Sequence, residues 1–549
     1  MSHKKKRKQV NQPVVMQKDP GSIRGLIKSN LLLLAIFVIF GFILYGRVLN
    51  GEFLTADDMA TIVEDPLSRD FKASVQTGSF MSIYEAGMYQ LFNYTSTGFH
   101  LASTILHIIN AFLAFLLISR LYNQKTALLA SLLFFVHPVN SETVSWISAF
   151  VYLLIGFVNL VVFLCLVEYR KSGNSAYLIG GVVTFASSLI FIRTPWLLTV
   201  PISVMVLDSA YFYEKGKSLK ENLIQKFNGS FFYFLAAGIY FATELVTKYA
   251  VRISDLKTYH YLDPTKSEPL INRYSYTITK SLELLLFPVN LTIFHEGEII
   301  TPAKLIFIIS IASLFIVLIL LLIFKRYFET AVLLLMIYIL ILPSFSPVIV
   351  AWFIAERYLY IPSLFFAVLV VTGLMQVEKN FKLNNFVTPF MVFLILMFSI
   401  KTFVRAGDWQ NDKKLWLATL EVSPLSYRVY NNLGDVYFKE GNYPLAIKNF
   451  EIAYQIKPDY ADAVHNIGHT YMQAGNLEEA KKYLQLSFQM NPRMYLSLFK
   501  LGIIEYQQGN LLEAKRYFEG AAQIEPNFEQ AKTALMQLNK YIEENKPAE

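Results

Sequence analysis

The sequence predicts an all-α protein in which a polytopic membrane domain is followed by an α-solenoid of short helical repeats. With 54% hydrophobic, 15% aromatic and only 16% charged residues, the composition lies outside the range of soluble proteins. The apolar sequence ends near residue 405, and the polar remainder repeats with a period of 34 residues. We therefore expect a basic leader at 1–25, a membrane domain at 26–405, a linker at 406–426 and a repeat domain at 427–549.

The leader sets the predicted orientation of the chain. Four lysines and one arginine occupy positions 4–8, directly before the first apolar run. Positive charge is retained on the cytoplasmic side of a membrane. The leader is long and is not followed by a small-residue cleavage site, so we expect a retained anchor instead of a cleaved signal. The N-terminus is predicted to be cytoplasmic.

Eleven apolar runs of the membrane domain are candidate spans. A span needs roughly 20 apolar residues, or somewhat fewer where flanking side chains reach the interface. The runs centre on Leu31–Tyr45, His100–Ile118, Ala127–Val139, Val144–Val167, Tyr177–Ile192, Leu197–Tyr213, Phe231–Val246, Leu305–Phe324, Ala331–Ile349, Leu359–Val377 and Phe386–Val404.

The charged loops between these runs agree with one topology. With a cytoplasmic start, five of them fall inside: Arg120–Lys125, Arg170–Lys171, Lys215–Lys226, Lys325–Arg326 and Glu378–Lys382. An odd number of spans then places the repeats outside, in the periplasm of a bacterium or the endoplasmic reticulum lumen of a eukaryote. Counting Leu282–Ile293 as a further span would break this pattern. We therefore expect that segment to be re-entrant or interfacial, on the outer side.

Charge and cysteine content argue against a nucleic-acid-binding protein and against a disulfide within the chain. The net charge of +8 comes from cations in short loops, not from a basic groove with interleaved aromatic residues. The sequence therefore predicts no nucleic-acid partner. Cys165 is the only cysteine, so no disulfide can form within the chain.

The polar part of the chain carries the pattern of tetratricopeptide (TPR) repeats. Gly434, Gly468 and Gly502 are spaced by 34 residues, the period of this helix–turn–helix unit. Small residues let two antiparallel helices pack closely, and a proline ends the second helix. The same period relates Gly441/Gly475/Gly509, Ala446/Ala480/Ala514 and Pro458/Pro492/Pro526. We predict three repeats, 427–460, 461–494 and 495–528, with Phe528–Tyr541 as a capping helix.

The first outer loop, Gly51–Gly98, holds the strongest candidate for chemistry. Asp57 and Asp58 follow the first span by only a few residues. One carboxylate beside the membrane can deprotonate an acceptor hydroxyl, and a second can orient it or hold a divalent ion against a phosphate. The alternative is a solvated acidic pair, and metal binding stays undetermined, with Asp57 and Asp58 as the candidate ligands.

A second candidate is the segment around Glu356 and Arg357, which precedes a span in an apolar and aromatic stretch. Charges at membrane depth tend to be functional, and arginine binds phosphate oxygens bidentately. Arg357 is therefore a candidate ligand for a lipid phosphate, with Glu356, Tyr358 and Tyr360 beside it. The alternative is an internal Glu–Arg pair that locks helix ends.

Three histidines and a glutamate are further pocket candidates. His100 and His107 lie seven residues apart on one helical face, and His137 and Glu142 border a proline turn. They do not show the spacing of a zinc site. Hydrogen-bonding histidines that hold helices together are the favoured reading over metal ligands.

These segments together resemble the transmembrane and TPR-containing O-mannosyltransferases, of the GT-C class of glycosyltransferases, and their bacterial relatives. The resemblance covers the chain after the leader. It is carried by Phe53–Asp58, by Gly98–His107 with Asn110, by Phe135–Ser148, by Ala355–Ser363 and by the junction from Trp409 to Gly434.

The resemblance implies a membrane enzyme of GT-C fold. Such an enzyme takes a sugar, mannose or another hexose, from a polyprenyl-phosphate donor in the membrane and transfers it to a protein hydroxyl on the outer face. It implies an acidic first-loop residue as general base, for which Asp58 is the first choice, inversion at the sugar carbon, and a cation such as Arg357 on the leaving phosphate. The TPR groove would present a protein or peptide acceptor.

The chain departs from the family at two places. Relatives often carry Tyr-Arg-Pro where this chain has Tyr89-Gln90-Leu91, so a cation is missing there. They often carry Lys-Glu before a membrane proline where this chain has Arg193-Thr194-Pro195. Arg193 is a candidate replacement for the missing cation.

Two other functions compete with the transferase. The first is a non-catalytic membrane-anchored TPR scaffold, although eleven spans exceed what an anchor needs. The second is a transporter, which would commonly show two related halves, and no internal repeat is visible before residue 405.

Overall fold

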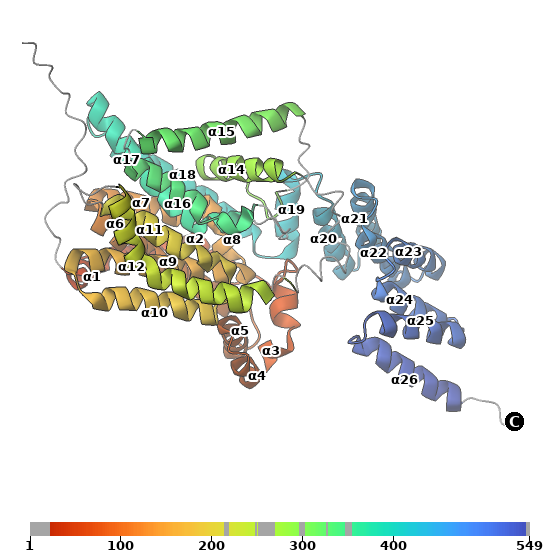
Figure 1. Cartoon of the computed structure of the whole chain (residues 1–549). Helices are drawn as coiled ribbons and strands as arrows, with labels where there is room; N and C mark the ends of the chain where they lie inside the picture. The colour runs from red at the N-terminus through yellow and green to blue at the C-terminus, as the bar shows by residue number, and fades with distance from the viewer. Residues whose placement is uncertain are drawn as a thin grey trace, which may run out of the picture. The chain divides into compact units, whose positions relative to one another are not determined.

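A computed structural model describes residues 22–212, 219–247, 250, 269–295, 302–324, 328–345 and 354–544. All regular elements in these ranges are helices (Figure 1). The described residues form two compact units, one comprising residues up to 410 except 292–295, and one comprising 292–295 and everything from 411 onward. The basic leader at positions 4–8 and the loop Lys325–Arg326 lie outside the described residues.

The first unit is a bundle of apolar helices. Its long elements are α2 (Leu31–Tyr45), α6 (Thr97–Leu121), α7 (Gln124–Val136), α9 (Phe150–Ser172), α10 (Ser175–Phe191), α11 (Val200–Tyr211), α12 (Leu219–Tyr240), α14 (Leu270–Leu286), α15 (Pro302–Phe324), α16 (Phe328–Ile339), α17 (Tyr360–Phe381) and α18 (Val387–Asp408). Short connectors are α1 (Ile23–Ser29), η5 (Pro195–Thr199), η6 (Phe241–Leu245) and η7 (Leu342–Phe345).

Five of the described helices are long and apolar enough to cross a membrane: Leu31–Val48, Thr97–Leu121, Ile147–Ser172, Glu356–Phe381 and Val387–Asp408. A sixth results if the bent pair Gln124–Val136 and Pro138–Ser145 counts as one span. Four shorter apolar helices, Ser175–Phe191, Pro195–Tyr211, Lys304–Leu320 and Glu329–Ile339, overlap other runs expected to be spans. The chain is thus a multi-helix membrane protein, and the total of eleven spans stays a prediction.

The bend at His137-Pro138 has a local cause. Pro138 has no N–H to continue α7. His137 ends that helix, and its Nδ1 accepts a hydrogen bond from the backbone N–H of Val139 at 3.2 Å. Three short helices follow before α9: η3 (Pro138–Asn140), α8 (Ser141–Ser145) and η4 (Ile147–Ala149). The axes of Gln124–Val136 and Pro138–Ser145 differ by 49°, so the chain bends here instead of continuing straight.

The loop after α2 is folded. It contains η1 (Gly46–Val48), η2 (Met59–Val63), α3 (Pro66–Arg69), α4 (Phe71–Gln76) and α5 (Phe80–Leu91). Asp65, Asp70 and Ser79 cap the last three of these helices with side-chain oxygens that accept backbone N–H groups. The loop is therefore a rigid support for Asp57 and Asp58.

Ion pairs with buried carboxylates join helices at the ends predicted to face inside. Arg120 binds Glu168 through two hydrogen bonds of 2.5 and 3.1 Å, and both side chains are buried. Arg170 binds Asp208 through two hydrogen bonds of 2.8 and 2.5 Å. Two of the cations that supplied the charge pattern thus also hold α6, α9 and α11 together.

Helix α14 is polar on its buried side. Arg273 and Lys280 are buried, whereas Ile271 and Leu286 are exposed. An apolar outer face suits a helix that lies against lipid. α14 ends at Leu286, so the segment Leu282–Ile293 begins as helix and continues as turns and irregular chain, and its placement in the membrane stays a prediction.

The second unit is a stack of antiparallel helix pairs (Figure 1). Its helices are α19 (Asp412–Val422), α20 (Tyr427–Lys439), α21 (Tyr443–Ile456), α22 (Ala461–Gln473), α23 (Leu477–Met490), α24 (Tyr495–Gln507), α25 (Leu511–Ile524) and α26 (Glu529–Glu544). Gly434 lets the helices of its pair meet, since a Cβ there would lie 2.4 Å from the Phe450 ring. Part of the expected linker is helical, because α19 packs on α20, and Trp416 stacks on Phe294.

Candidate active site

The side chain of Asp58, in the first outer loop, is held by three hydrogen bonds. Its Oδ1 accepts hydrogen bonds from the Ser148 backbone N–H at 3.0 Å and the Ser148 hydroxyl at 2.5 Å, and its Oδ2 accepts from the Leu54 N–H at 3.1 Å. The side chain is 0% exposed. Burial raises the pKa of Asp58 to about 6, although the three hydrogen bonds oppose the shift. Asp58 therefore joins the loop to the turn before α9.

Asp57 is the exposed member of the pair. Its backbone adopts φ 117°, a region that residues with a side chain rarely occupy. Such strain is concentrated at functional sites. Partial burial raises the pKa of Asp57, and the positive charge of Arg357 lowers it.

Arg357 lies in η8 (Glu356–Leu359) and is enclosed by aromatic rings. Its guanidinium carbon is 5.0 Å from the Trp146 ring centre, 5.1 Å from that of Tyr358 and 6.0 Å from that of Tyr152. It also forms a buried ion pair with Glu142. The internal pair considered from the sequence is therefore present, but its acidic member is Glu142 and not the neighbouring Glu356.

The turn 146–148 links the acidic and basic parts of the site. Trp146 lies under Arg357, and Ser148, two residues later, binds Asp58. Because one short turn contacts both Asp58 and Arg357, the backbone geometry of this turn sets the distance between the two side chains.

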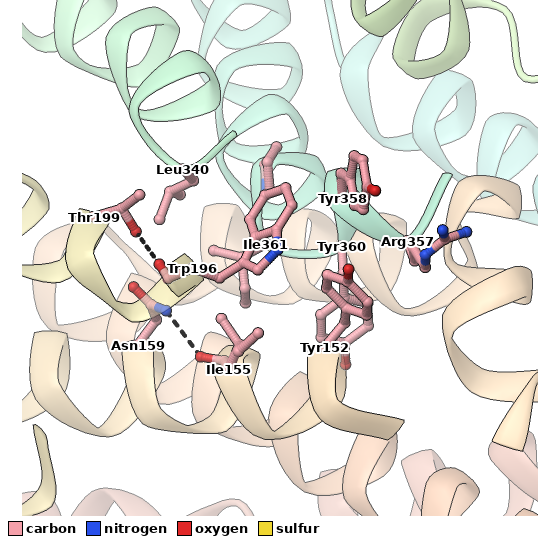
Figure 2. A pocket seen from close by; sticks show the side chains of 11 residues that line it. Tyr152, Ile155, Asn159, Trp196, Thr199, Leu340, Arg357, Tyr358, Tyr360 and Ile361 are labelled. Carbon is pink, nitrogen blue, oxygen red and sulfur yellow. Dashed lines mark hydrogen bonds between the residues drawn. The ribbon is translucent and has the colours of Figure 1, made fainter. Parts of the chain in front are cut away.

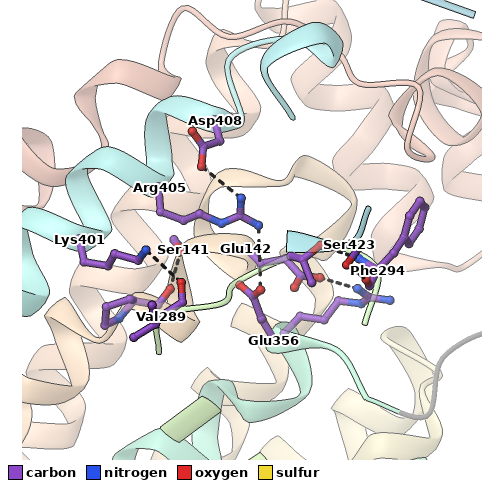
Figure 3. A network of polar contacts seen from close by, with 12 residues as sticks. Ser141, Glu142, Val289, Phe294, Glu356, Lys401, Arg405, Asp408 and Ser423 are labelled. Carbon is purple, nitrogen blue, oxygen red and sulfur yellow. Dashed lines mark hydrogen bonds and ion pairs between the residues drawn. The ribbon is translucent and has the colours of Figure 1, made fainter. Parts of the chain in front are cut away.

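Glu356 pairs with a different residue from Glu142, namely Arg405 on α18. Its Oε1 lies 3.9 Å from Nη2 of Arg405, and Nη1 of Arg405 is 3.1 Å from the Asp408 carboxylate. Figure 3 shows Arg405, near the end of α18, between Glu356 and Asp408. Sequence analysis did not include Arg405 among the site residues, because it stands at the end of a long apolar helix and far from Glu356 in the chain.

A pocket opens beside Arg357 (Figure 2). Its empty volume is about 290 Å³, including the part open to solvent. The lining is mainly apolar and aromatic, with Arg357 at one side and Asn159 within the pocket wall. The lining residues are Tyr152, Ile155, Asn159, Trp196, Thr199, Leu340, Arg357, Tyr358, Tyr360, Ile361 and Pro362.

Two of the histidines hold helices together. His107 bonds the hydroxyl of Tyr360 at 2.8 Å and the carbonyl of Phe135 at 3.0 Å. His137 donates from Nε2 to the carbonyl of Leu285 at 3.1 Å, since its Nδ1 accepts. His100 is also buried and packs beside Gly51. No group of three metal-ligating side chains occurs among the residues that the structure describes.

The aromatic neighbours of Arg357 have different surroundings. Tyr358 packs on Trp196 with ring centres 4.6 Å apart and lines the pocket. The hydroxyl of Tyr360 lies at hydrogen-bonding distance from His107 and accepts from Asn110 at 3.1 Å. Tyr360 also crosses closely over Gly156, where a Cβ would lie 2.6 Å from its ring.

Arg193, the proposed replacement cation, lies at the exposed end of α10. Its backbone has φ 54°, and its Nε donates to the Ile190 carbonyl at 2.8 Å. Its Nη2 lies 3.5 Å from the position of a Cβ on Gly78 in the first outer loop. Arg193 therefore reaches the loop that carries Asp57.

Glu85 and Ser148 also belong to this region, and sequence reasoning missed both. Burial raises the pKa of Glu85 to about 8, and Asp65 and Asp58 add to the shift. Glu85 is an isolated acid in an aromatic stretch, which gave a weak signal. Ser148 lies within the recognised segment Phe135–Ser148, but its contact with Asp58 depends on tertiary structure.

The repeat domain matches known family models. A model described as TPR repeat matches residues 421–480, and one described as tetratricopeptide repeat matches residues 465–527. The predicted TPR assignment is confirmed.

Relatives of the chain include several O-mannosyl-transferases. A Caenorhabditis elegans protein named protein O-mannosyl-transferase F38B6.6 is 24% identical over 472 residues, which cover 81% of this chain and 64% of that protein. Human protein O-mannosyl-transferase TMTC3 is 35% identical over 112 residues, or 20% of this chain and 12% of the relative. Human TMTC2 is 32% identical over 117 residues, with coverages of 21% and 14%. The chain spans less than two thirds of the length of these relatives.

Proposed function

We propose that the chain is a membrane glycosyltransferase of the GT-C class, because its sequence is similar to protein O-mannosyl-transferases and it carries TPR repeats. It transfers mannose or another hexose from a polyprenyl-phosphate donor to a serine or threonine hydroxyl of a protein, on the outer face of the membrane. The observation that carries this proposal is the turn 146–148, because Trp146 lies under Arg357 and Ser148 binds Asp58, the neighbour of the exposed Asp57.

We assign different roles to Asp57 and Asp58 in activating the acceptor hydroxyl. A general base must reach the hydroxyl proton, and Asp57 is exposed whereas Asp58 is 0% exposed. We therefore assign the base to Asp57, although the sequence favoured Asp58. Asp58, whose carboxylate accepts three hydrogen bonds, fixes the strained backbone that presents Asp57.

The reaction is a direct displacement. The acceptor oxygen attacks the anomeric carbon of the sugar while the bond from that carbon to the phosphate oxygen breaks. The lipid phosphate leaves with the electron pair, the proton passes to Asp57, and the configuration inverts. Arg357 is the cation assigned to the leaving phosphate.

The pocket supports a lipid-linked donor. Ile155, Leu340 and Ile361 provide apolar surface for the first part of a polyprenyl chain, and Arg357 lines the same pocket. Because Glu142 already neutralises Arg357, a bound phosphate has to share this cation with Glu142. The proposal therefore includes a second cation near the donor, for which Arg193 is the candidate.

The TPR helices supply the acceptor site in this proposal. Helical solenoids have a concave surface that suits an extended peptide. The three matched repeats make a short array with such a surface. We assign it to the protein acceptor, and the lipid donor to the membrane unit.

Substitution of each aspartate tests the proposal. A host lacking the gene is complemented with wild type, Asp57→Asn, Asp58→Asn or Asp70→Asn, and intact masses of envelope and secreted proteins are measured. Asp70 is a matched control, because it lies in the same loop and only caps α4. Hexose-sized additions should return with wild type and Asp70→Asn, be lost with Asp57→Asn, and be reduced with Asp58→Asn.

Other outcomes have definite meanings. If Asp58→Asn loses hexose transfer and Asp57→Asn keeps it in full, the general base is Asp58 and not Asp57. Full transfer by both variants would reject a transferase site at this loop. If wild type adds no hexose and the repeats still capture envelope proteins, the chain is a non-catalytic scaffold.

A further inference from the structure

The last turn of α18 and the two residues after it contact both halves of the candidate active site. This exit segment comprises residues 405–410, from Arg405 to Gln410. It ends the membrane unit. No sequence motif placed it near the chemistry, because it lies more than 340 residues after Asp58 in the chain.

Arg405 connects the exit segment to the half of the site that contains Arg357. Its side chain is 4% exposed and lies between the carboxylates of Glu356 and Asp408, at 3.9 and 3.1 Å. Glu356 is 0% exposed. A buried carboxylate is strongly destabilising when its cation is removed. Arg405 therefore holds the first residue of η8, next to Arg357.

Gln410 connects the exit segment to the start of the loop that bears Asp57. Its backbone carbonyl accepts a hydrogen bond from the Glu52 N–H at 2.8 Å, and its side-chain amide donates to the Arg47 carbonyl at 2.7 Å. Gly51 lies beside this contact, where a Cβ would be 3.4 Å from the Gln410 carbonyl oxygen, and the closer distance of 2.9 Å would be to the Val48 carbonyl oxygen. The exit segment thus fixes the start of the loop that bears Asp57.

Trp409 completes the segment. It is fully buried and stacks on Trp146 with ring centres 6.0 Å apart and an interplanar angle of 23°. Trp146 in turn lies under Arg357. The guanidinium of Arg405 is 5.6 Å from the Trp409 ring. Two independent routes, one through Glu356 and one through the paired indoles, therefore join Arg405 to Arg357.

We propose that Arg405 is a positioning residue of the transferase site, which sets Arg357 through Glu356 and Trp409 while the same helix end holds the root of the Asp57 loop through Gln410. This inference rests on the proposed function for its catalytic consequence. The contacts themselves do not depend on it.

Arg405 is not assigned to the donor phosphate. Two carboxylates, Glu356 and Asp408, flank its single positive charge. An anion entering this place would meet excess negative charge and repulsion. Arg357, which lines the pocket, is the cation that a ligand can reach.

The first test is kinetic. Purified full-length wild type, Arg405→Met, Arg405→Lys and Lys401→Met are assayed with a polyprenyl-phosphate mannose donor and a serine-rich peptide. Lys401 is the matched control, because it lies one turn earlier on α18 and its Nζ donates a hydrogen bond to the Val289 carbonyl at 3.0 Å, away from Glu356 and Asp408. Arg405→Met should lower kcat about 100-fold, the cost of a misplacement near 1 Å, and change KM for the donor little. Arg405→Lys should recover part of kcat, and Lys401→Met should match wild type.

A double substitution separates positioning from general instability. Glu356→Gln removes the buried charge that Arg405 compensates, so Glu356→Gln with Arg405→Met should be no slower than Arg405→Met alone. Independent, multiplying losses would overturn the proposal, as would unchanged kcat in Arg405→Met. A rise in donor KM with unchanged kcat would instead make Arg405 a donor ligand, which also overturns it.

The second test needs no substrate and so stays valid if the proposed function fails. Hydrogen exchange is followed by mass spectrometry in peptides covering residues 50–58. Arg405→Met and Arg405→Lys should each speed exchange at the Glu52 amide, which bonds Gln410, while Lys401→Met should not. Unchanged exchange in both arginine variants would reject the positioning role. If wild type has no transferase activity but exchange responds as expected, only the proposed function is wrong.

Discussion

At the scale of single residues, two adjacent aspartates have opposite environments. Asp58 is enclosed and accepts three hydrogen bonds, whereas Asp57 is exposed on a backbone with φ 117°. The sequence shows only two identical side chains in a loop. Which carboxylate points inward depends on Ser148, 90 residues further along the chain, so the division of roles was not predictable.

The raised pKa of Asp58 predicts a pH dependence of stability. Its folded-state pKa of about 6 exceeds the reference value of 3.8, so between these values the folded state binds more protons than the unfolded state. The contribution of Asp58 to the unfolding free energy therefore rises as pH falls from about 7 to about 4, by at most about 3 kcal/mol. Asp58→Asn removes this contribution.

Chemical denaturation of wild type and Asp58→Asn over that pH range measures the effect. Other carboxylates destabilise both proteins in acid, so the difference between the two isolates Asp58. Wild type should gain stability relative to the variant as pH decreases. A relative loss would show that the hydrogen bonds outweigh burial and that the pKa lies below the reference value.

At the scale of elements, local sequence signals were most reliable where a helix begins or ends. Pro138 ends α7, and the period of 34 residues located the repeat helices. Local signals did not reveal that Asp412–Val422, within the expected linker, forms a helix. Its burial of Leu415 and Trp416 explains the helix, because tertiary packing stabilises a short segment that would be marginal alone.

The buried pair of Arg120 and Glu168 predicts an outcome at this scale. Arg120→Met leaves a carboxylate buried without its cation and should cost about 3 to 5 kcal/mol. Arg120→Met with Glu168→Leu should recover most of that loss, because well-packed apolar residues replace a buried pair at little cost. Thermal unfolding in detergent measures both. A double variant as unstable as Arg120→Met would mean that the pair contributes through another partner.

At the scale of the whole molecule, orientation in the membrane is the main prediction still to be tested. Charge pattern and an odd span count place the repeats outside. Five or six helices meet the length and hydropathy of a span among the described residues, so the count alone does not decide the side.

Cysteine labelling tests the orientation. In a Cys165→Ala background, Glu519→Cys in α25 and Lys379→Cys after the buried part of α17 both present exposed thiols. In intact cells or sealed vesicles of known sidedness, an impermeant maleimide added outside should label residue 519 directly and residue 379 only after permeabilisation. The reverse pattern would place the repeats in the cytoplasm.

The all-helical class, the membrane and repeat parts and the TPR period follow from the amino-acid sequence alone, because hydropathy and spacing are local properties of the chain. The sequence also selected Asp57, Asp58 and Arg357 as candidates. The pairing of Glu142 with Arg357, of Asp58 with Ser148 and of Arg405 with Glu356 became visible only in the folded chain. These contacts join segments distant in the chain, and their geometry depends on helix packing that no local pattern records.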